Sequence, residues 1–166
     1  MIYCFYGFSK AGKDTIAKEL IQKMNFERIS FADKPKQILC KILNKNFEKF
    51  EEIKDTKFED KTYRECLIDL AEEIKKIDKN FWVKFLINNL KDISNKNYVL
   101  TDLRFYHELN YLRENLKENV KFIKIIGGER INEDLIQDKE FDLILDNSEK
   151  KEENIEKFVK KIKELN

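Results

Sequence analysis

Residues 7–15 read Gly-Phe-Ser-Lys-Ala-Gly-Lys-Asp-Thr and have the pattern G-x-x-x-x-G-K. An apolar run at residues 2–6 precedes them, and apolar residues follow helical spacing from Lys13 onward. In this context glycines let backbone N–H groups converge on a polyphosphate at the positive end of a helix, and the lysine reaches the β- and γ-phosphates. The pattern therefore predicts a phosphate-binding loop. Its ligand-binding residues are expected to be Ser9, Lys10, Ala11, Gly12, Lys13, Asp14 and Thr15.

A plain glycine turn is the alternative interpretation of this stretch. The chain has only four glycines, so chance predicts roughly 0.015 matches to the pattern, even before its strand–loop–helix context is required. A regulatory GTPase is disfavoured as well, because the sequence contains neither D-x-x-G nor N-K-x-D. The motif thus favours a nucleotide-binding protein of another kind.

Asp14 stands where such loops usually carry a serine or threonine whose hydroxyl binds Mg²⁺. A carboxylate can serve magnesium directly or through water, and its charge also suits the start of a helix. Asp14 is therefore a predicted metal-binding residue.

Strand-like and helix-like segments alternate along the rest of the chain. Five short apolar segments read as strands: residues 2–6, 28–31, 98–100, 120–126 and 143–145. Helical spacing is found from residue 13, over 35–43, 62–77, 80–90 and 106–115, and from about 150. Alternation of this kind predicts a three-layer α/β fold with a parallel five-stranded sheet, whose ligands lie beyond the carboxyl ends of the strands.

Composition narrows the class of protein further. The 33 basic and 32 acidic residues alternate in sign, which argues against nucleic-acid binding but leaves room for a small anionic substrate. The apolar runs are well short of the roughly twenty residues of a membrane helix. Three scattered cysteines without a C-x-x-C pair make a zinc site or a disulfide framework improbable, so a cytoplasmic protein is expected.

The chain contains 28 lysines and five arginines, so each arginine is a candidate for a role that needs a planar guanidinium. Arg104 follows a predicted strand end and Asp102, where it could clamp an acceptor phosphate bidentately. Asp102 could hold magnesium or orient Arg104. Arg64 is a second candidate clamp, although it could merely pair with Asp60 or Glu65.

Five segments together resemble the deoxynucleoside monophosphate kinase family of bacteriophages. The loop at residues 7–15 matches the family's G-x-x-x-x-G-K-D-T, and residues 31–36 are similar to F-A-D-P-L-K. Residues 64–73 are similar to R-x-x-L-Q-x-L-G-T-E, residues 102–108 match D-x-R-F-x-x-E, and residues 141–147 resemble the last strand with its terminal asparagine. Animal phosphomevalonate kinases share parts of this pattern.

The resemblance implies a nucleoside monophosphate kinase-like P-loop fold over residues 1–166, with a helical acceptor-binding insertion at about 44–95 and a short lid at about 127–140. It implies Mg²⁺-dependent transfer of the ATP γ-phosphate to a deoxynucleoside 5′-monophosphate. A homodimer is one expectation, since the family includes dimers.

Residue roles are carried over by position. The expected catalytic residues are Lys13, Lys10, Arg104 and Arg130. The expected substrate-binding residues are Asp33, Lys36, Arg64, Glu73, Trp82, Asp102 and Arg104, and the expected metal ligands are Asp14 and Asp102. Trp82 could equally pack two helices together, and Glu73 could simply join a local charge pair.

Two alternatives stay open at this point. One is another small-molecule P-loop kinase that acts on a phosphorylated acceptor of the phosphomevalonate or dephospho-coenzyme A type. The other is a non-catalytic module that binds a nucleoside triphosphate without transferring its phosphate.

Overall fold

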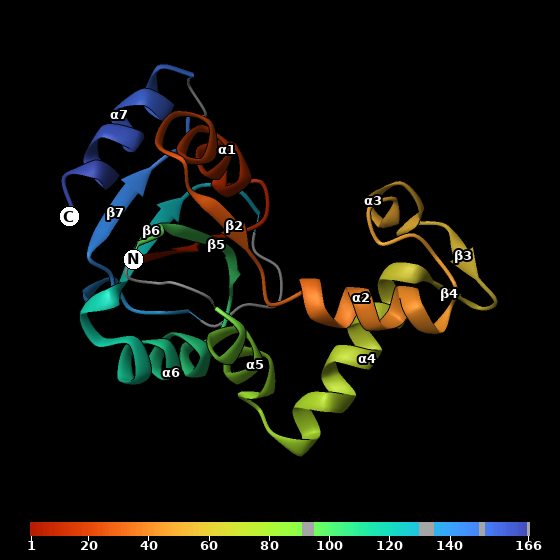
Figure 1. Cartoon of the computed structure of the whole chain (residues 1–166). Coiled ribbons are helices and arrows are strands. Elements are labelled where there is room, and N and C mark those ends of the chain that lie inside the picture. The colour runs from red at the N-terminus through yellow and green to blue at the C-terminus, as the bar shows by residue number, and fades with distance from the viewer. Residues whose placement is uncertain (91–94, 130–134, 150–151, 166) are drawn as a thin grey trace. The chain divides into compact units, whose positions relative to one another are not determined.

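The computed structural model describes residues 1–90, 95–129, 135–149 and 152–165. The chain divides into two compact units, each of which is described here by itself (Figure 1). Unit 1 comprises Met1–Ser30 and Leu90–Asn166, and unit 2 comprises Phe31–Asn89. Among the described residues, no helix has the length and apolar character needed to cross a membrane.

Unit 1 is built on a parallel five-stranded sheet with the order β2-β5-β1-β6-β7, which confirms the predicted fold class. The strands are β1 (Ile2–Tyr6), β2 (Glu27–Ile29), β5 (Tyr98–Leu103), β6 (Val120–Ile126) and β7 (Leu143–Asp146). All five residues of β1 are buried, as expected for the central strand of a sheet covered on both faces.

Three helices cover this sheet: α1 (Lys13–Met24), α6 (Tyr106–Leu116) and α7 (Glu152–Lys163). Figure 1 shows α1 and α7 on one face of the sheet and α6 on the other. Tyr3 and Phe5 of β1 share one core with Leu20 of α1 and Ile162 of α7, because alternate residues of a strand face the same side. Two 3₁₀ turns, Lys117–Asn119 and Asp138–Glu140, complete unit 1.

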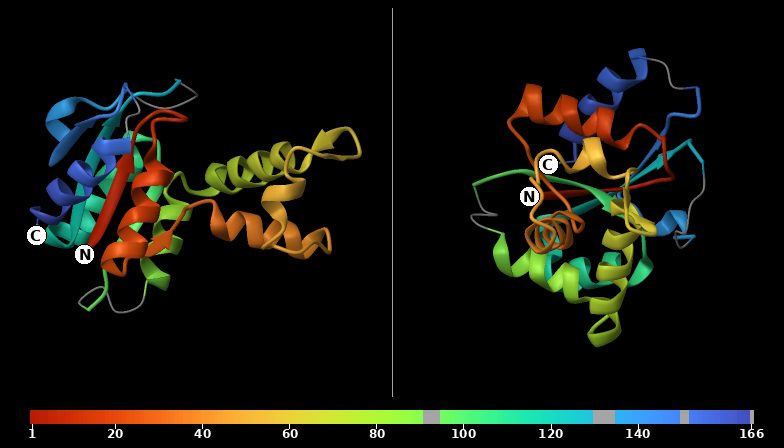
Figure 2. Two further views of the ribbon diagram at one scale, coloured as in Figure 1. Left: turned by 90° about the horizontal axis from the view of Figure 1, so that it is seen from above. Right: turned by 90° about the vertical axis from the view of Figure 1, so that its right-hand side faces the viewer.

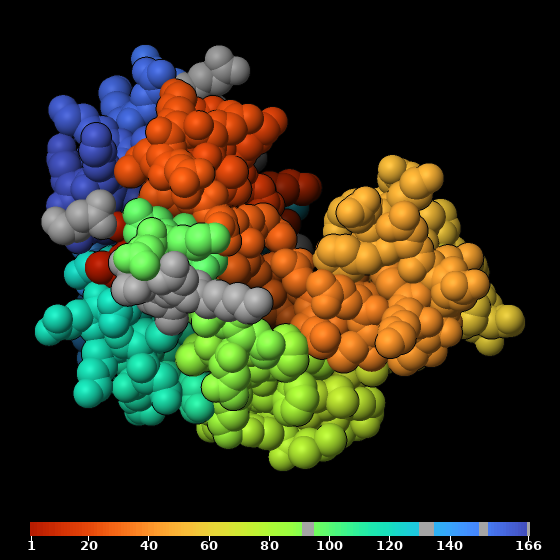
Figure 3. Space-filling model, in the orientation of Figure 1, coloured from red at the N-terminus to blue at the C-terminus, as the bar shows by residue number. Residues whose placement is uncertain are grey.

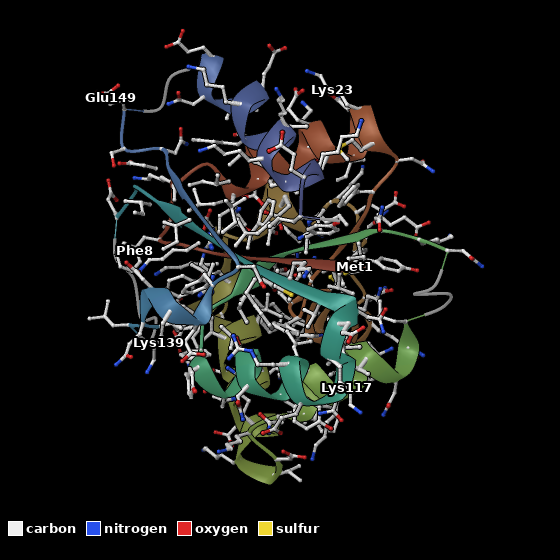
Figure 4. All side chains as sticks on the ribbon, turned by 90° about the vertical axis from the view of Figure 1, so that its left-hand side faces the viewer. Met1, Phe8, Lys23, Lys117, Lys139 and Glu149 are labelled. Atoms are coloured by element: carbon white, nitrogen blue, oxygen red, sulfur yellow. The ribbon has the colours of Figure 1, made fainter. Side chains whose placement is uncertain are left out.

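The register of the sheet sets the position of the loops. Ile2 pairs with Tyr98 on one side and with Val120 on the other, so β1, β5 and β6 run together toward the same edge. Phe8 and Met1 accordingly lie at opposite ends of β1 (Figure 4). The segments that follow β1, β5, β6 and β7 therefore converge at the carboxyl edge, where ligands of such sheets bind.

Unit 2 contains four helices and a small hairpin: α2 (Asp33–Ile42), α3 (Phe50–Ile53), β3 (Lys57–Phe58), β4 (Lys61–Thr62), α4 (Tyr63–Ile77) and α5 (Phe81–Asn89). Its core is formed by Leu39, Cys40, Phe50 and Tyr63. Figure 2 shows the antiparallel hairpin at one end of the unit, and Figure 3 shows residues 31–53 as one packed surface in orange and gold.

Two segments of unit 2 add detail to the sequence expectation. Unit 2 includes α2, which lies ahead of the insertion predicted from about residue 44, because α2 packs against α4 and joins the same core. The charged segment at residues 44–61, in which a short helix and a loop are plausible from sequence, forms α3 and the β3–β4 hairpin. At its end Thr62 and Glu65 form a capping box that starts α4.

Candidate active site

The predicted phosphate loop connects β1 to α1 at the carboxyl edge of the sheet. The Lys13 ammonium folds back over this loop and donates to the carbonyls of Gly7 and Phe8, the latter at 2.8 Å. Gly12 has a φ of +95° and precedes the first residue of α1. Main-chain amides, a lysine and a helix N-terminus thus meet in one turn, which is the arrangement that binds polyphosphates.

A second loop, residues 127–129, is hydrogen-bonded to the phosphate loop. The Ser9 amide donates to the Glu129 carbonyl at 3.0 Å, and the Glu129 amide donates back to the Ser9 carbonyl at 2.8 Å. The Glu129 carboxylate also lies 3.1 Å from the Lys10 ammonium. The phosphate loop is therefore held in place by an isolated two-residue bridge.

Gly128 permits this close approach. A Cβ atom at this position would lie 2.1 Å from the Ser9 carbonyl oxygen and 2.7 Å from the Ala11 nitrogen, and the φ of Gly128 is +79°. Only glycine fits such a contact between two backbones. The sequence interpretation assigned this segment to a lid, and the structure shows that its first residues support the phosphate loop. Arg130, the expected lid residue, lies outside the described residues.

Asn147 supports the phosphate loop from the end of β7. Its side chain is only 3% exposed, and its Nδ2 donates to the Ala11 carbonyl at 2.9 Å. The backbone N–H of Asn147 donates to the Ile126 carbonyl, which connects Asn147 to β6. The sequence interpretation included Asn147 in a family pattern without giving it a role. A polar residue directly after a predicted strand, at the ligand-binding edge of the sheet, is the signal that identifies it.

Asp102 lies within β5, close to its carboxyl end. Its Oδ2 accepts a hydrogen bond of 2.7 Å from the Ser30 hydroxyl, which follows β2 and is buried. This hydrogen bond between neighbouring strands therefore places the Asp102 carboxylate at the edge of the sheet. Burial raises the pKa of the Cys4 thiol well above its usual range, and the charges of Asp102 and Asp142 add to that rise.

Arg104 follows β5 directly, and its side chain is exposed. The turn that presents it is fixed by Glu108, which is only 5% exposed. The carboxylate of Glu108 accepts hydrogen bonds of 3.0 Å from the backbone amides of both Arg104 and Phe105. In the motif D-x-R-F-x-x-E, the glutamate thus has a positioning role that the sequence alone does not reveal.

Asp14 lies in the first turn of α1 with an exposed side chain. No group of three or more histidine, cysteine, aspartate or glutamate side chains in the described part of the chain could hold a metal by itself. Mg²⁺ at phosphoryl-transfer sites is commonly bound by one or two carboxylates together with substrate phosphates. Asp14 and Asp102 therefore stay predicted ligands for a metal of that kind.

Three of the predicted acceptor-binding residues lie in ion pairs within unit 2. Lys36 lies 2.7 Å from Glu51, Arg64 lies 2.7 Å from Asp55, and Glu73 pairs with Lys76. The partner of Arg64 is therefore Asp55, not the Asp60 or Glu65 considered from the sequence. Hydrogen bonds from Lys36 and Lys54 lower the pKa of Glu51 to about 2. Asp33 begins α2.

Trp82 packs α5 against α4. Its side chain is 4% exposed, and its indole N–H donates to the Ala71 carbonyl at 3.1 Å. Of the two interpretations left open for this residue, the structure supports packing, since a buried ring presents no free face to a nucleobase.

A shallow hollow of about 390 Å³ lies on α2 and the segment after it, and Lys34, Lys41 and Lys45 line it with Phe47. Within the described part of the chain, no carboxylate lies in salt-bridge range of these three ammonium groups. Lys34 and Lys45 instead lie over the rings of Phe85 and Tyr63, respectively. The hollow is therefore electropositive.

Solved structures show the fold to which this geometry belongs. A sugar kinase from Janibacter sp. HTCC2649 aligns with a TM-score of 0.54 at 14% identity, covering 97% of this chain and 91% of that one. Dephospho-CoA kinase from Campylobacter jejuni aligns with a TM-score of 0.54 at 15% identity, covering 99% and 96%. No curated protein sequence matches this chain.

A family model described as phosphomevalonate kinase matches residues 5–118, which is more than half of the chain. The match includes the phosphate loop, all of unit 2 and the Asp102–Glu108 motif. It agrees with the kinase geometry and the P-loop kinase fold described above. The chain is a small-molecule P-loop kinase, and it belongs to the phosphomevalonate kinase family.

Proposed function

We propose that this protein transfers the γ-phosphoryl group of ATP to the phosphate group of a small anionic acceptor, with phosphomevalonate as the first candidate. The observation that carries the proposal is the preformed phosphate loop with Lys13 folded over it, in a chain that belongs to this family. The finer choice of acceptor rests on the chemistry of the residues around the site.

An acceptor that already carries a phosphate offers an anionic oxygen as nucleophile and needs no general base. Catalysis then requires in-line positioning and neutralisation of the charge on the transferred group. Lys13 and the loop amides would hold the donor phosphates, and Arg104 would clamp the acceptor phosphate through its guanidinium. Asp14 and Asp102 would hold Mg²⁺, which when bound supplies further charge neutralisation. None of the roles assigned here needs a histidine.

Two observations support a compact acyclic acceptor over a nucleotide. Trp82, the aromatic residue that the sequence offered for stacking on a base, is buried. The family model points in the same direction.

A deoxynucleoside monophosphate remains the second candidate acceptor. The observation that favours it is the joint occurrence of the loop ending Lys13-Asp14-Thr15 and the Asp102–Glu108 motif, on which the resemblance to the phage kinases rests. Both candidates present a phosphate monoester, so the roles of Lys13 and Arg104 would be the same.

A coupled assay of ADP release tests the proposal. Purified protein with Mg²⁺ and ATP would be supplied in turn with phosphomevalonate, each deoxynucleoside and ribonucleoside monophosphate, and dephospho-coenzyme A. We expect acceptor-dependent ADP release with phosphomevalonate, lost in the Lys13→Ala variant. Turnover only on deoxynucleoside monophosphates would establish the second candidate. Nucleotide binding without turnover on any acceptor would contradict the kinase assignment.

A further inference from the structure

We propose that Asn147 is a positioning residue that holds the Ala11–Gly12 peptide in the orientation needed for phosphate binding. This inference rests on the proposed function, because it assigns a role within the same nucleotide site. Asn147 directly follows β7 and contacts the phosphate loop, which lies more than 130 positions earlier in the chain.

The orientation follows from the planarity of the peptide bond. In a trans peptide the carbonyl of one residue and the N–H of the next point in opposite directions. The Ala11 carbonyl points at Asn147 Nδ2, at 2.9 Å. The Gly12 N–H must therefore point away from Asn147 and toward the opposite side of the loop. Lys13, which follows Gly12, has its ammonium on the Gly7 and Phe8 carbonyls of the same loop.

The loop and the Asn147 side chain are tightly packed at this point. A Cβ atom on Gly12 would lie 2.5 Å from Asn147 Nδ2, so the loop backbone is in direct contact with the amide. Asn147 is also anchored through its own backbone to Ile126. The amide thus connects the last strand of the sheet to the peptide that precedes the loop lysine.

The second polar atom of this side chain argues for a specific role. Asn147 Oδ1 is buried and has no hydrogen-bond partner among the described residues. A buried amide that leaves its oxygen unpaired is unfavourable compared with an apolar side chain of the same size. Its retention is explained if the N–H donor is needed at Ala11, where a leucine could not donate.

The test compares Asn147→Asp with the wild type, because aspartate keeps the shape and replaces the donor by an acceptor. We expect the Kd of inorganic tripolyphosphate and of ATP to rise about tenfold, since the buried Ala11 carbonyl would lose its donor. The KM for the acceptor should change little. Leu145→Ala, at a buried position of the same strand, is the control. It should lower the melting temperature and leave both Kd values unchanged.

The outcomes separate the alternatives. An unchanged tripolyphosphate Kd in Asn147→Asp overturns the inference, as does a loss for ATP alone, which would assign Asn147 to the base. Equal losses in Leu145→Ala would reduce the effect to general destabilisation and overturn it too. Wild-type protein that fails to bind tripolyphosphate would instead contradict the proposed function.

A measurement on the wild type keeps the inference testable if Asn147→Asp does not fold. The side-chain NH₂ signals of Asn147 and the backbone signal of Gly12 can be followed by ¹⁵N NMR during titration with tripolyphosphate. Both should shift with one common midpoint. A Gly12 shift without any response from Asn147 would overturn the proposal.

Discussion

The loop region of unit 1 and the charged surface of unit 2 are built in different ways. Around the phosphate loop the contacts are made by backbone groups and by buried side chains, as in the Ser9–Glu129 bridge and the Asn147–Ala11 bond. In unit 2 three of the predicted acceptor residues are charged side chains in ion pairs, such as the exposed pair of Arg64 with Asp55. Backbone geometry is fixed before a ligand arrives, whereas exposed ion pairs can exchange one partner for another at little cost.

The largest effect is expected where two backbones touch. Gly128→Ala would place a Cβ atom 2.1 Å from the Ser9 carbonyl at a φ of +79°. Relief of that clash must move the two loops apart and so remove the support of the phosphate loop. We therefore expect the ATP Kd to rise about tenfold or more, since local backbone strain costs roughly 1–3 kcal/mol. Isothermal titration calorimetry measures this directly.

Glu129→Ala is the matched control for Gly128→Ala. It removes the side chain that pairs with Lys10 and keeps the backbone bridge to Ser9. Its ATP Kd should stay within a few-fold of the wild type, since the pair is exposed and such pairs contribute little. A larger loss in Glu129→Ala than in Gly128→Ala would reverse the claim that backbone contacts shape this loop.

The next effect is expected in the kinetic parameters for the acceptor and not in those for ATP. Arg104→Ala removes an exposed guanidinium whose backbone is fixed by Glu108. We expect the acceptor KM to rise, or kcat to fall, about tenfold to a hundredfold, because hydrogen bonds to charged groups contribute about 1.5–3 kcal/mol. The KM for ATP should stay nearly constant. Steady-state kinetics measures this, with Arg28→Ala at an exposed position of β2 as the control. An equal loss of ATP affinity would assign Arg104 to the donor site.

A smaller effect on the acceptor KM is expected at Arg64, and it distinguishes a residue that binds the acceptor phosphate from one that only forms a surface ion pair. Arg64→Ala should raise the acceptor KM about fivefold if the guanidinium exchanges Asp55 for the acceptor phosphate. Asp55→Asn should leave the KM unchanged or lower it, since it releases the guanidinium. If both variants raise KM equally, the pair serves the structure of unit 2 and Arg64 is not an acceptor residue.

The sequence predicts best what local patterns control. The phosphate loop, the five parallel strands and the position of Arg104 after a strand end all follow from short-range spacing. It does not show that Gly128 and Asn147 contact the loop, because they reach the loop only through the order of the sheet. Ser30 is missed for the same reason: its bond to Asp102 depends on the pairing of β2 with β5.

In unit 2 the sequence is informative about helices and less so about individual side chains. Capping at Thr62 and the proline in the first turn of α2 agree with simple rules. Simple rules do not predict which carboxylate pairs with Arg64, since Asp55, Asp60 and Glu65 are all close to it in sequence. The hairpin decides it, because Arg64 N donates to the Lys54 carbonyl and brings the guanidinium to Asp55.

The smallest expected effect concerns the stability of unit 2 at low pH. Hydrogen bonds from Lys36 and Lys54 lower the pKa of Glu51 from 4.5 to about 2. A carboxyl whose folded pKa is depressed adds stability above its unfolded pKa and loses it as the pH falls toward the folded value. The contribution of Glu51 should therefore be constant above pH 4.5 and disappear between pH 4.5 and about 2. Because the carboxylate is 60% exposed, we expect less than about 1 kcal/mol.

Urea unfolding of the wild type and Glu51→Gln across this pH range measures the effect. The difference in unfolding free energy should be steady from pH 7 to 4.5 and then shrink. In a Lys36→Met background the same substitution should matter less, since Lys36 is the largest cause of the lowered pKa. A difference that grows as the pH falls has the opposite sign to that of a stabilised carboxylate, so it would show that the ion pairs of unit 2 do not hold Glu51 in its charged form.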